Sequence, residues 1–212
     1  MNCGRHIIVC EGESEWAYLQ RFQSFLEKQP LDEGAFEPRL LLIAPVRAVS
    51  KSGRFSKLEK HYRNARQENK RASIKIWADF DLFHRNDGQC ADLYKVKCTG
   101  IPDFHFSFLN FEDFLALHLD DGQFQEWLQF GRQRHFTTPL HSQVYLPEFL
   151  KILPDYRKGD LPVEFICWNS LKNLKRNKAM RPTSNPHNLQ QIRCFADFLI
   201  GEIETAYPGA LQ

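Results

Sequence analysis

The stretch Ile7-Ile8-Val9-Cys10-Glu11-Gly12-Glu13-Ser14-Glu15 decides the fold class of this chain. Its first four residues form a short, largely β-branched apolar run, which is typical of a buried β-strand. Gly12 allows the chain to turn tightly after that strand. Beyond it, apolar residues recur at spacings of three and four, which predicts an amphipathic helix that stops before Pro30: Trp16, Leu19, Phe22, Phe25 and Leu26.

The same alternation of strand and helix continues through the first half of the chain. Apolar runs predict further strands at Arg39–Ala44, Ser73–Ala78 and Phe104–Leu109. Helices are predicted between them at Phe55–Asn69 and after them at Phe111–Leu119. Strands that alternate with helices indicate an α/β fold with a mostly parallel sheet flanked by helices.

The pattern changes after about residue 120. Helical spacing predicts helices at Phe124–Phe130, Leu146–Leu153 and Ile192–Ile203. We find no repeat, low-complexity stretch or Gly/Ser linker between the halves. We therefore expect residues 1–120 to form the α/β core and residues 121–212 to form a helical extension that completes the same domain.

The amino-acid composition excludes several classes of protein. The chain has 212 residues, a formal charge of +2, 42% hydrophobic and 25% charged residues, which excludes a disordered tail, a collagen-like fibre and a coiled coil. Its apolar runs are far shorter than the roughly 20 residues that cross a bilayer. The six cysteines include no Cys-x-x-Cys pair, and a glutamate follows the first apolar run at once. We expect a reduced, cytoplasmic protein without a signal peptide or membrane segment.

Acidic residues follow two of the predicted strands. Glu11 comes directly after the first strand, and Asp79 and Asp81 come after the third. The carboxyl ends of parallel strands form the ligand crevice of an open α/β sheet. Asp79 and Asp81 point to the same face if the chain is extended, and Glu11 converges on them if the two strands are neighbours. Glu15 lies one helical turn beyond Glu11 and is directed to the same place.

Converging carboxylates repel one another, and a hard cation relieves that repulsion. Oxygen-only ligands suit Mg²⁺ or Mn²⁺ rather than zinc. Such an ion neutralises phosphate charge and activates water, so a nucleic-acid phosphate is a natural substrate. Acids after strands are also common for the plain reason that loops are polar. The joint occurrence of the acids, in order and each at the end of a strand, favours the metal site.

One segment carries a strong positive charge, although the charge of the whole chain is close to neutral. The segment Lys51–Arg71 is strongly basic, and four of its residues are our candidates for contact with nucleic acid: Arg54, Lys57, Lys60 and Arg63. A spacing of three residues drifts around an α-helix, so these charges do not form one narrow stripe. An ordinary solvated helix face is the alternative interpretation.

At the acidic residues the chain resembles the Toprim domain, and more specifically the RloB-like family related to OLD-type Toprim nucleases. Residues Ile8–Glu15 are similar to the family's "VEGxTE" opening, and Asp79-Phe80-Asp81 to its Asp-x-Asp. Residues Phe111–His118 are similar to its "FELWLLLH" helix. Two later stretches resemble its "YKKG" and "NPS" motifs: Tyr156-Arg157-Lys158-Gly159 and Ser184-Asn185-Pro186. The chain departs from the family where Asp113-Phe114 replaces Leu-Trp and where the proline before that helix is missing.

The resemblance implies a Toprim nuclease of the antiphage-defence type, with relatives often paired with a regulatory ATPase. It implies Glu11 as a general acid/base or metal ligand, and Lys158 as a group that neutralises charge on a phosphate. The implied ligands of Mg²⁺ or Mn²⁺ are Glu11, Glu15, Asp79, Asp81 and Glu112. Asp113 is an alternative to Glu112 in that set.

Two other classes of function compete with a nuclease. The chain is alternatively a nucleic-acid-binding module with no turnover, or an interaction subunit that acts as a silent toxin under the control of a partner ATPase. The presence of Glu11, Asp79 and Asp81 together favours the enzyme. The prediction leaves open whether the substrate is DNA or RNA and whether the chain forms a homo-oligomer.

Overall fold

A five-stranded parallel sheet forms the centre of the protein. The computed structural model describes residues 5–29, 41–48, 55–79, 103–107, 109–134, 141–181 and 193–212. The strands lie in the order β2-β1-β3-β4-β5, with these bounds: β1 (Arg5–Cys10), β2 (Leu42–Arg47), β3 (Ser73–Ala78), β4 (Phe104–Phe106) and β5 (Arg193–Cys194). The predicted α/β fold with a parallel sheet is confirmed, and the arrangement is Rossmann-like.

The strand β1 pairs with β2 on one side and with β3 on the other. Cys10, its last residue, is level with Arg47 of β2 and with Trp77 of β3. The direction in which strands are added reverses between β1 and β3. In open α/β sheets this reversal is the point at which ligands bind, beyond the carboxyl ends of the strands.

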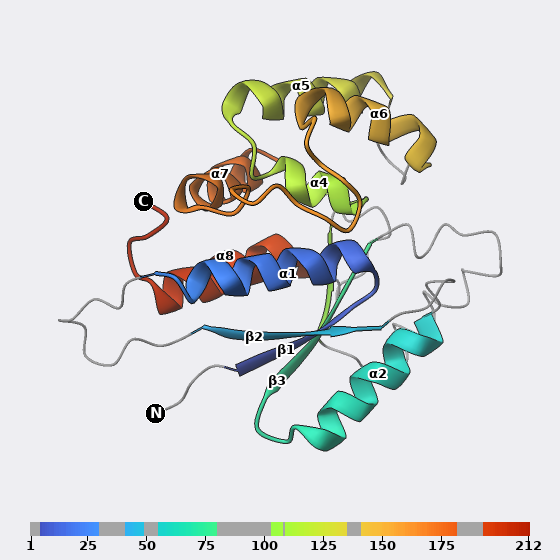
Figure 1. Ribbon diagram of the computed structural model, residues 1–212, viewed down its shortest axis with the longest axis vertical. Coiled ribbons are helices and arrows are strands. Elements are labelled where there is room, and N and C mark those ends of the chain that lie inside the picture. The colour runs from blue at the N-terminus through green and yellow to red at the C-terminus, as the bar shows by residue number, and fades with distance from the viewer. Residues whose placement is uncertain are drawn as a thin grey trace.

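Helices cover both faces of the sheet (Figure 1). The helices α1 (Glu13–Leu26) and α8 (Phe195–Ala206) lie side by side on one face, and α2 (Phe55–Glu68) lies on the other. A further layer beyond α1 and α8 contains α4 (Phe111–Ala116), α5 (Asp121–Gln133), α6 (Ser142–Ile152) and α7 (Trp168–Met180). In the part of the chain that the structure describes, no helix is both long and apolar enough to cross a bilayer.

The alternation of side chains along β1 divides the core in two. Ile7 and Val9 pack with β3, β4 and the buried face of α2, where Leu58, Tyr62 and Ala65 lie. Ile8 and Cys10 face the larger core beneath α1 and α8. That core is rich in aromatic residues, and its centre is Trp77, whose ring stacks on Phe195 of α8 at a centroid distance of 3.8 Å.

His118 belongs to this aromatic core. Its Nδ1 lies 3.2 Å from the carbonyl oxygen of Phe114, and its Nε2 lies 2.9 Å from the hydroxyl of Tyr18. A carbonyl oxygen only accepts, so Nδ1 carries the hydrogen and Nε2 accepts from Tyr18. Burial lowers the pKa of His118 from 6.5 to about 4, so the ring is neutral at pH 7.

Some element bounds differ from those predicted from the sequence. β2 runs three residues further than expected and continues through Pro45. β2 is an edge strand of the described sheet and pairs only with β1, and edge strands tolerate proline because one side of the strand needs no N–H donor. β4 ends at Phe106 rather than at Leu109. The helix α7 and the two-residue strand β5 were not predicted.

Candidate functional site

The ends of β1 and β3 bring Glu11 and Asp79 together. The backbone N–H of Glu11 donates to the carbonyl oxygen of Trp77 at 2.9 Å, which extends the strand pairing by one residue. The backbone N–H of Asp79 then donates to Oε2 of Glu11 at 3.0 Å. Glu11 is buried, with 7% of its surface exposed. The condition that the first and third strands are neighbours is met, and Glu11 lies beside Asp79, the first residue after β3.

The carboxylate of Asp79 in turn reaches the start of α4. Its Oδ2 accepts a hydrogen bond from the backbone N–H of Phe111 at 3.0 Å. Glu112 is the next residue and lies in the first turn of the helix. A chain of contacts therefore connects Glu11, Asp79 and the backbone next to Glu112, although these residues are up to 101 positions apart in the sequence.

Glu15 folds back over Gly12 at the beginning of α1. A Cβ atom built on Gly12 would lie 2.8 Å from Oε2 of Glu15, closer than real contacts allow. Gly12 has an extended backbone, with φ −128° and ψ −175°, that any residue adopts. Glycine at this position leaves space for the Glu15 carboxylate, which occupies the place that a side chain on residue 12 would take. Glu15 is buried, and its charge acts on the thiol of Cys10 at the end of β1, where burial of the thiol and then the charge of Glu15 raise the pKa of that thiol.

Glu112 is held by a tyrosine from a distant loop. The hydroxyl of Tyr156 donates to Oε1 of Glu112 at 2.9 Å. Burial raises the pKa of Glu112, while the charge of Lys158 and the hydroxyls of Tyr156 and Tyr145 act in the opposite direction. Tyr156 is also hydrogen-bonded to Ser14 in the first turn of α1. Tyr156 therefore connects α1 and α4 at the acidic end of the sheet.

Lys158 lies in a tight turn beside this tyrosine. Arg157 and Asp160 exchange backbone hydrogen bonds of 3.2 and 2.8 Å, and Gly159 has a φ of +83°, which favours glycine. A Cβ on Gly159 would lie 3.1 Å from Cγ of Glu13, so the turn packs closely against the start of α1. Lys158 itself is exposed. The structure thus brings the turn that contains Lys158 against the start of α1, beside the acidic edge.

Asp113 has a different environment from its neighbour Glu112. Its Oδ1 accepts from Nη1 of Arg181 and from Nε1 of Trp127, each at 3.0 Å. Its Oδ2 accepts from the backbone N–H of Asn110 at 3.1 Å, in a capping box at the start of α4. Asp113 holds α4, α5 and the end of α7 together. Of the two alternatives, Glu112 is therefore the one that lies with the acidic edge.

The remaining predicted residues divide into two groups. Asp81 and Arg54 lie outside the described residues. Lys57, Lys60 and Arg63 are exposed on α2, on the opposite face of the sheet from α1 (Figure 1). Arg63 forms an ion pair with Glu59 one turn earlier. The end of α2 leads into β3, so its first turns, with Lys57 and Lys60, lie toward the carboxyl ends of the strands.

The donor chemistry of the acidic edge suits a hard divalent ion. Glu11, Glu15, Asp79 and Glu112 provide only oxygen ligands, the type that Mg²⁺ and Mn²⁺ prefer. Within the described ranges, however, no group of three or more His, Cys, Asp or Glu side chains is arranged to hold a metal ion. The predicted third strand-end ligand, Asp81, lies outside those ranges. The case for a metal ion at this edge therefore rests on two observations: the candidate ligand atoms are all oxygens, and Glu11 is hydrogen-bonded to the backbone of Asp79.

Sequence reasoning missed part of the cluster around Glu112. Ser14 and Tyr145 were not predicted, although both are hydrogen-bonded to Tyr156 or Glu112. Ser14 lies within the opening motif Ile8–Glu15, so its position was a usable signal. Tyr145 lies in α6 and carried no signal beyond the helical pattern around it.

No protein-family model, curated protein or solved structure gives a match to this chain. The likeness to RloB-like Toprim proteins therefore rests on the sequence motifs alone and stays a prediction.

Proposed function

We propose that this protein is a divalent-metal-dependent nuclease that hydrolyses phosphodiester bonds of RNA or DNA at the carboxyl edge of β1 and β3. The observation that carries the proposal is the 3.0 Å hydrogen bond from the Asp79 backbone to the Glu11 carboxylate. It brings the backbone of Asp79 against the carboxylate of Glu11, beyond the carboxyl ends of β1 and β3, where such sheets bind ligands. The resemblance to RloB-like proteins supports the same interpretation, with an antiphage-defence role.

Each residue at this edge has a role that follows from its surroundings. Glu11 and Asp79 would hold the ion, with Glu15 and Glu112 as further ligands. When bound, Mg²⁺ or Mn²⁺ neutralises phosphate charge and activates water. The backbone amides that bond Glu11 and Asp79 orient the two carboxylates in advance. The exposed ammonium of Lys158 is positioned to bind a phosphate oxygen in front of the acidic edge.

The test compares conservative variants of the purified chain on labelled RNA and DNA oligonucleotides. With Mg²⁺ or Mn²⁺ we expect cleavage that EDTA abolishes. Glu11→Gln and Asp79→Asn should each lower the rate by on the order of 100-fold or more. Thermal unfolding reports whether the variants stay folded, and titration with Mn²⁺ measures metal binding independently of cleavage. Glu126→Gln on the exposed surface of α5 is the matched control and should retain full activity.

The proposal fails if both Glu11→Gln and Asp79→Asn cut as fast as the original chain. It also fails if the folded protein neither binds Mn²⁺ nor cuts any nucleic acid.

A second candidate function is nucleic-acid binding without turnover. The exposed cations of α2 favour it, because Lys57 and Lys60 face solvent where they can contact phosphates, as does Arg63, which also pairs with Glu59. Charge reversal at both Arg63 and Arg66 should then weaken nucleic-acid binding and make the affinity less dependent on salt concentration. Binding that is unchanged by this double reversal would contradict a role for α2.

A further inference from the structure

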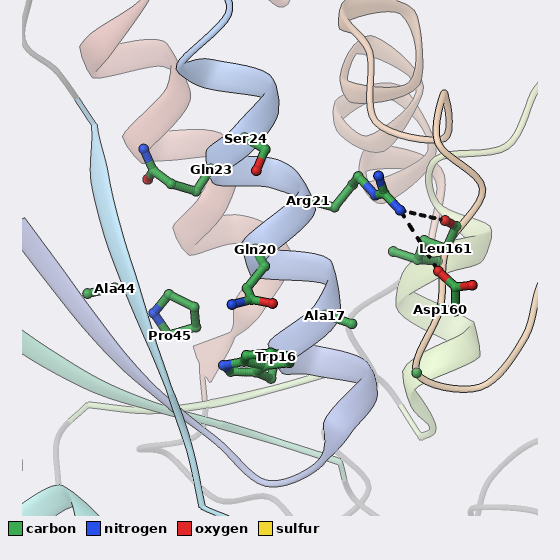
Figure 2. A pocket seen from close by; sticks show the side chains of 11 residues that line it. Trp16, Ala17, Gln20, Arg21, Gln23, Ser24, Ala44, Pro45, Asp160 and Leu161 are labelled. Atoms are coloured by element: carbon green, nitrogen blue, oxygen red, sulfur yellow. Dashed lines mark hydrogen bonds and ion pairs between the residues drawn. The ribbon is translucent and has the colours of Figure 1, made fainter.

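A shallow cleft lies along the exposed side of α1, with a volume of about 670 Å³. That volume is in the range of ligand-binding clefts. Its floor is α1 itself, and its two walls are β2 and the loop after the Lys158 turn (Figure 2). Six residues define the cleft: Trp16, Gln20 and Ser24 on the floor, Pro45 on one wall, and Asp160 and Leu161 on the other.

Both walls are fastened to α1 by hydrogen bonds. The backbone N–H of Ile43, in β2, donates to Oε1 of Gln23 at 2.8 Å. On the other side, Nη2 of Arg21 donates to the carbonyl oxygen of Leu161 at 3.2 Å and lies 3.8 Å from the carboxylate of Asp160 (Figure 2). The cleft is therefore formed before any ligand arrives, which lowers the entropic cost of binding.

The cleft begins at the acidic edge and leads away from it. Trp16 directly follows Glu15, and Gly159, which also lines the cleft, directly follows Lys158. From Trp16 to Ser24 the floor extends along α1 for about 12 Å, at 1.5 Å per helical residue. A strand with one phosphate at the acidic edge would therefore have its next nucleotides over α1.

The lining suits bases better than phosphates. Gln20 and Ser24 are exposed and offer neutral hydrogen-bonding groups. The guanidinium of Arg21 is already engaged with Leu161 and Asp160. Trp16 provides an aromatic ring that is half-buried against the larger core, and the Arg47 guanidinium lies over this ring, 5.7 Å from its centre, while pairing with Glu13 at 3.2 Å. An aromatic ring next to neutral amides is the combination that recognises unpaired bases.

We infer that this cleft binds an unpaired segment of the substrate strand next to the phosphate that is cleaved, with a base stacked on Trp16. The inference rests on the proposed nuclease function and specifies its substrate as single-stranded at this position. In a duplex the faces of the bases are covered by their neighbours, so Trp16 has no base face to contact. Gln20 and Ser24 then contact the edges of the stacked base and of the next one.

The experiment measures binding of fluorescent single-stranded and duplex oligonucleotides, as both RNA and DNA, in EDTA so that the strands stay intact. Single strands should bind more tightly than duplexes. Trp16→Ala should weaken single-strand binding roughly 5- to 150-fold, which is the range for loss of one base–aromatic stack. Trp16→Phe should restore most of the affinity, because it keeps an aromatic ring. Quenching of tryptophan fluorescence by the oligonucleotide should be smaller in Trp16→Phe than in the original chain.

A charge-matched pair of variants separates the cleft from general electrostatics. Gln20→Glu in α1 and Lys28→Gln each lower the charge of the chain by one unit, and Lys28 is exposed two residues beyond the end of α1. Gln20→Glu should weaken binding much more than Lys28→Gln. Three results would each overturn the inference. They are equal effects of Gln20→Glu and Lys28→Gln on single-strand affinity, an affinity of Trp16→Ala equal to that of the original chain, and tighter binding of duplex than of single strands.

These outcomes are independent of the proposed nuclease function. Cleavage that depends on Glu11 but is insensitive to Trp16→Ala and Gln20→Glu would remove the cleft from the mechanism and leave the nuclease intact. Single-strand binding that depends on Trp16, in a protein that cuts nothing with Mg²⁺ or Mn²⁺, would support the cleft and reject the nuclease.

Discussion

Two regions of this protein bury carboxylates, and they hold them in different ways. Where α4 meets α5 and α7, Asp113 is paired with the cation of Arg181 and bonded to Trp127 and to a backbone amide. At the carboxyl edge of β1 and β3, Glu11 and Asp79 accept from backbone amides, and Glu112 accepts from the hydroxyl of Tyr156. Glu112 and Asp113 are adjacent in the chain, so the contrast is a matter of surroundings and not of sequence position.

We expect the first of these regions to contribute to stability and the second to function. An ion pair with every hydrogen bond satisfied fastens helices together, and removal of one partner leaves a buried charge. The hydrogen bonds described at the carboxyl edge come from neutral donors, which orient a carboxylate without cancelling its charge, and the nearby Lys158 acts on Glu112 through its charge. We therefore expect changes in the first region to alter the free energy of unfolding and changes in the second to alter activity.

The largest expected effect on stability is that of Asp113→Asn. Asp113 and Arg181 have side-chain exposures of 1% and 14%, so the variant leaves a buried guanidinium without its counter-charge. We expect a loss of about 3–5 kcal/mol in the free energy of unfolding, measured by urea denaturation. Glu112→Gln, the matched change one residue earlier, should cost less than about 1 kcal/mol and should instead lower cleavage.

The double variant Asp113→Asn with Arg181→Met checks the reason for that loss, because removing both charges should recover part of the stability. A stability loss for Glu112→Gln as large as that for Asp113→Asn would break the distinction between the two regions.

The next-largest expected effect is a dependence of stability on pH, which comes from the buried neutral histidines. Burial lowers the pKa of both His118 and His105 from 6.5 to about 4. As the pH falls below 6.5 the unfolded chain takes up these protons first, so stability is full above pH 6.5 and declines toward pH 4. The decline should be up to about 3 kcal/mol for each histidine.

Chemical denaturation across this pH range measures the slope. Equal stability at pH 6.5 and pH 4.5 would show that these histidines are not neutral core residues.

The smallest expected effect on stability, with a clear effect on activity, is that of Gly12→Ala. The new Cβ would meet the Glu15 carboxylate at 2.8 Å, and the flexible end of Glu15 moves aside. We expect a change below about 1 kcal/mol in the free energy of unfolding and a fall of roughly tenfold to 100-fold in cleavage rate, because small displacements at a reacting centre are costly.

Gly201→Ala in α8 is the matched control, because nothing lies within 4 Å of its added Cβ. It should keep full activity and stabilise the helix by roughly 1 kcal/mol. Unchanged cleavage by Gly12→Ala would exclude a need for Glu15 in its present position.

Local patterns were sufficient to predict the central elements. Ser73–Ala78 is β3 at the predicted bounds, because a β-branched apolar run bounded by polar residues is a strong strand signal. The placement of Glu11 beside Asp79 followed from the rule that parallel strands end at one edge. That rule needed only β1 and β3 to be neighbours, which the structure provides.

Long-range contacts were not predictable in the same way. The bond between Tyr156 and Glu112 joins residues 44 positions apart, and that between Arg181 and Asp113 joins residues 68 apart. Nothing local distinguishes Asp113 from Glu112, since both follow Phe111 in an acidic first turn. The strand β5 has only two residues, which are too few to show the alternation of side chains that predicts a strand. It forms because β4 lies beside it as a pairing partner.

That short strand has a consequence for synthesis on the ribosome. β5 pairs with β4, and the ring of Phe195 directly after it stacks on Trp77, the residue whose carbonyl holds Glu11 in register. The aromatic core beneath the acidic edge is therefore incomplete until residue 195 has left the exit tunnel. We expect a nascent chain to lack an ordered acidic edge while only residues 1–194 have emerged.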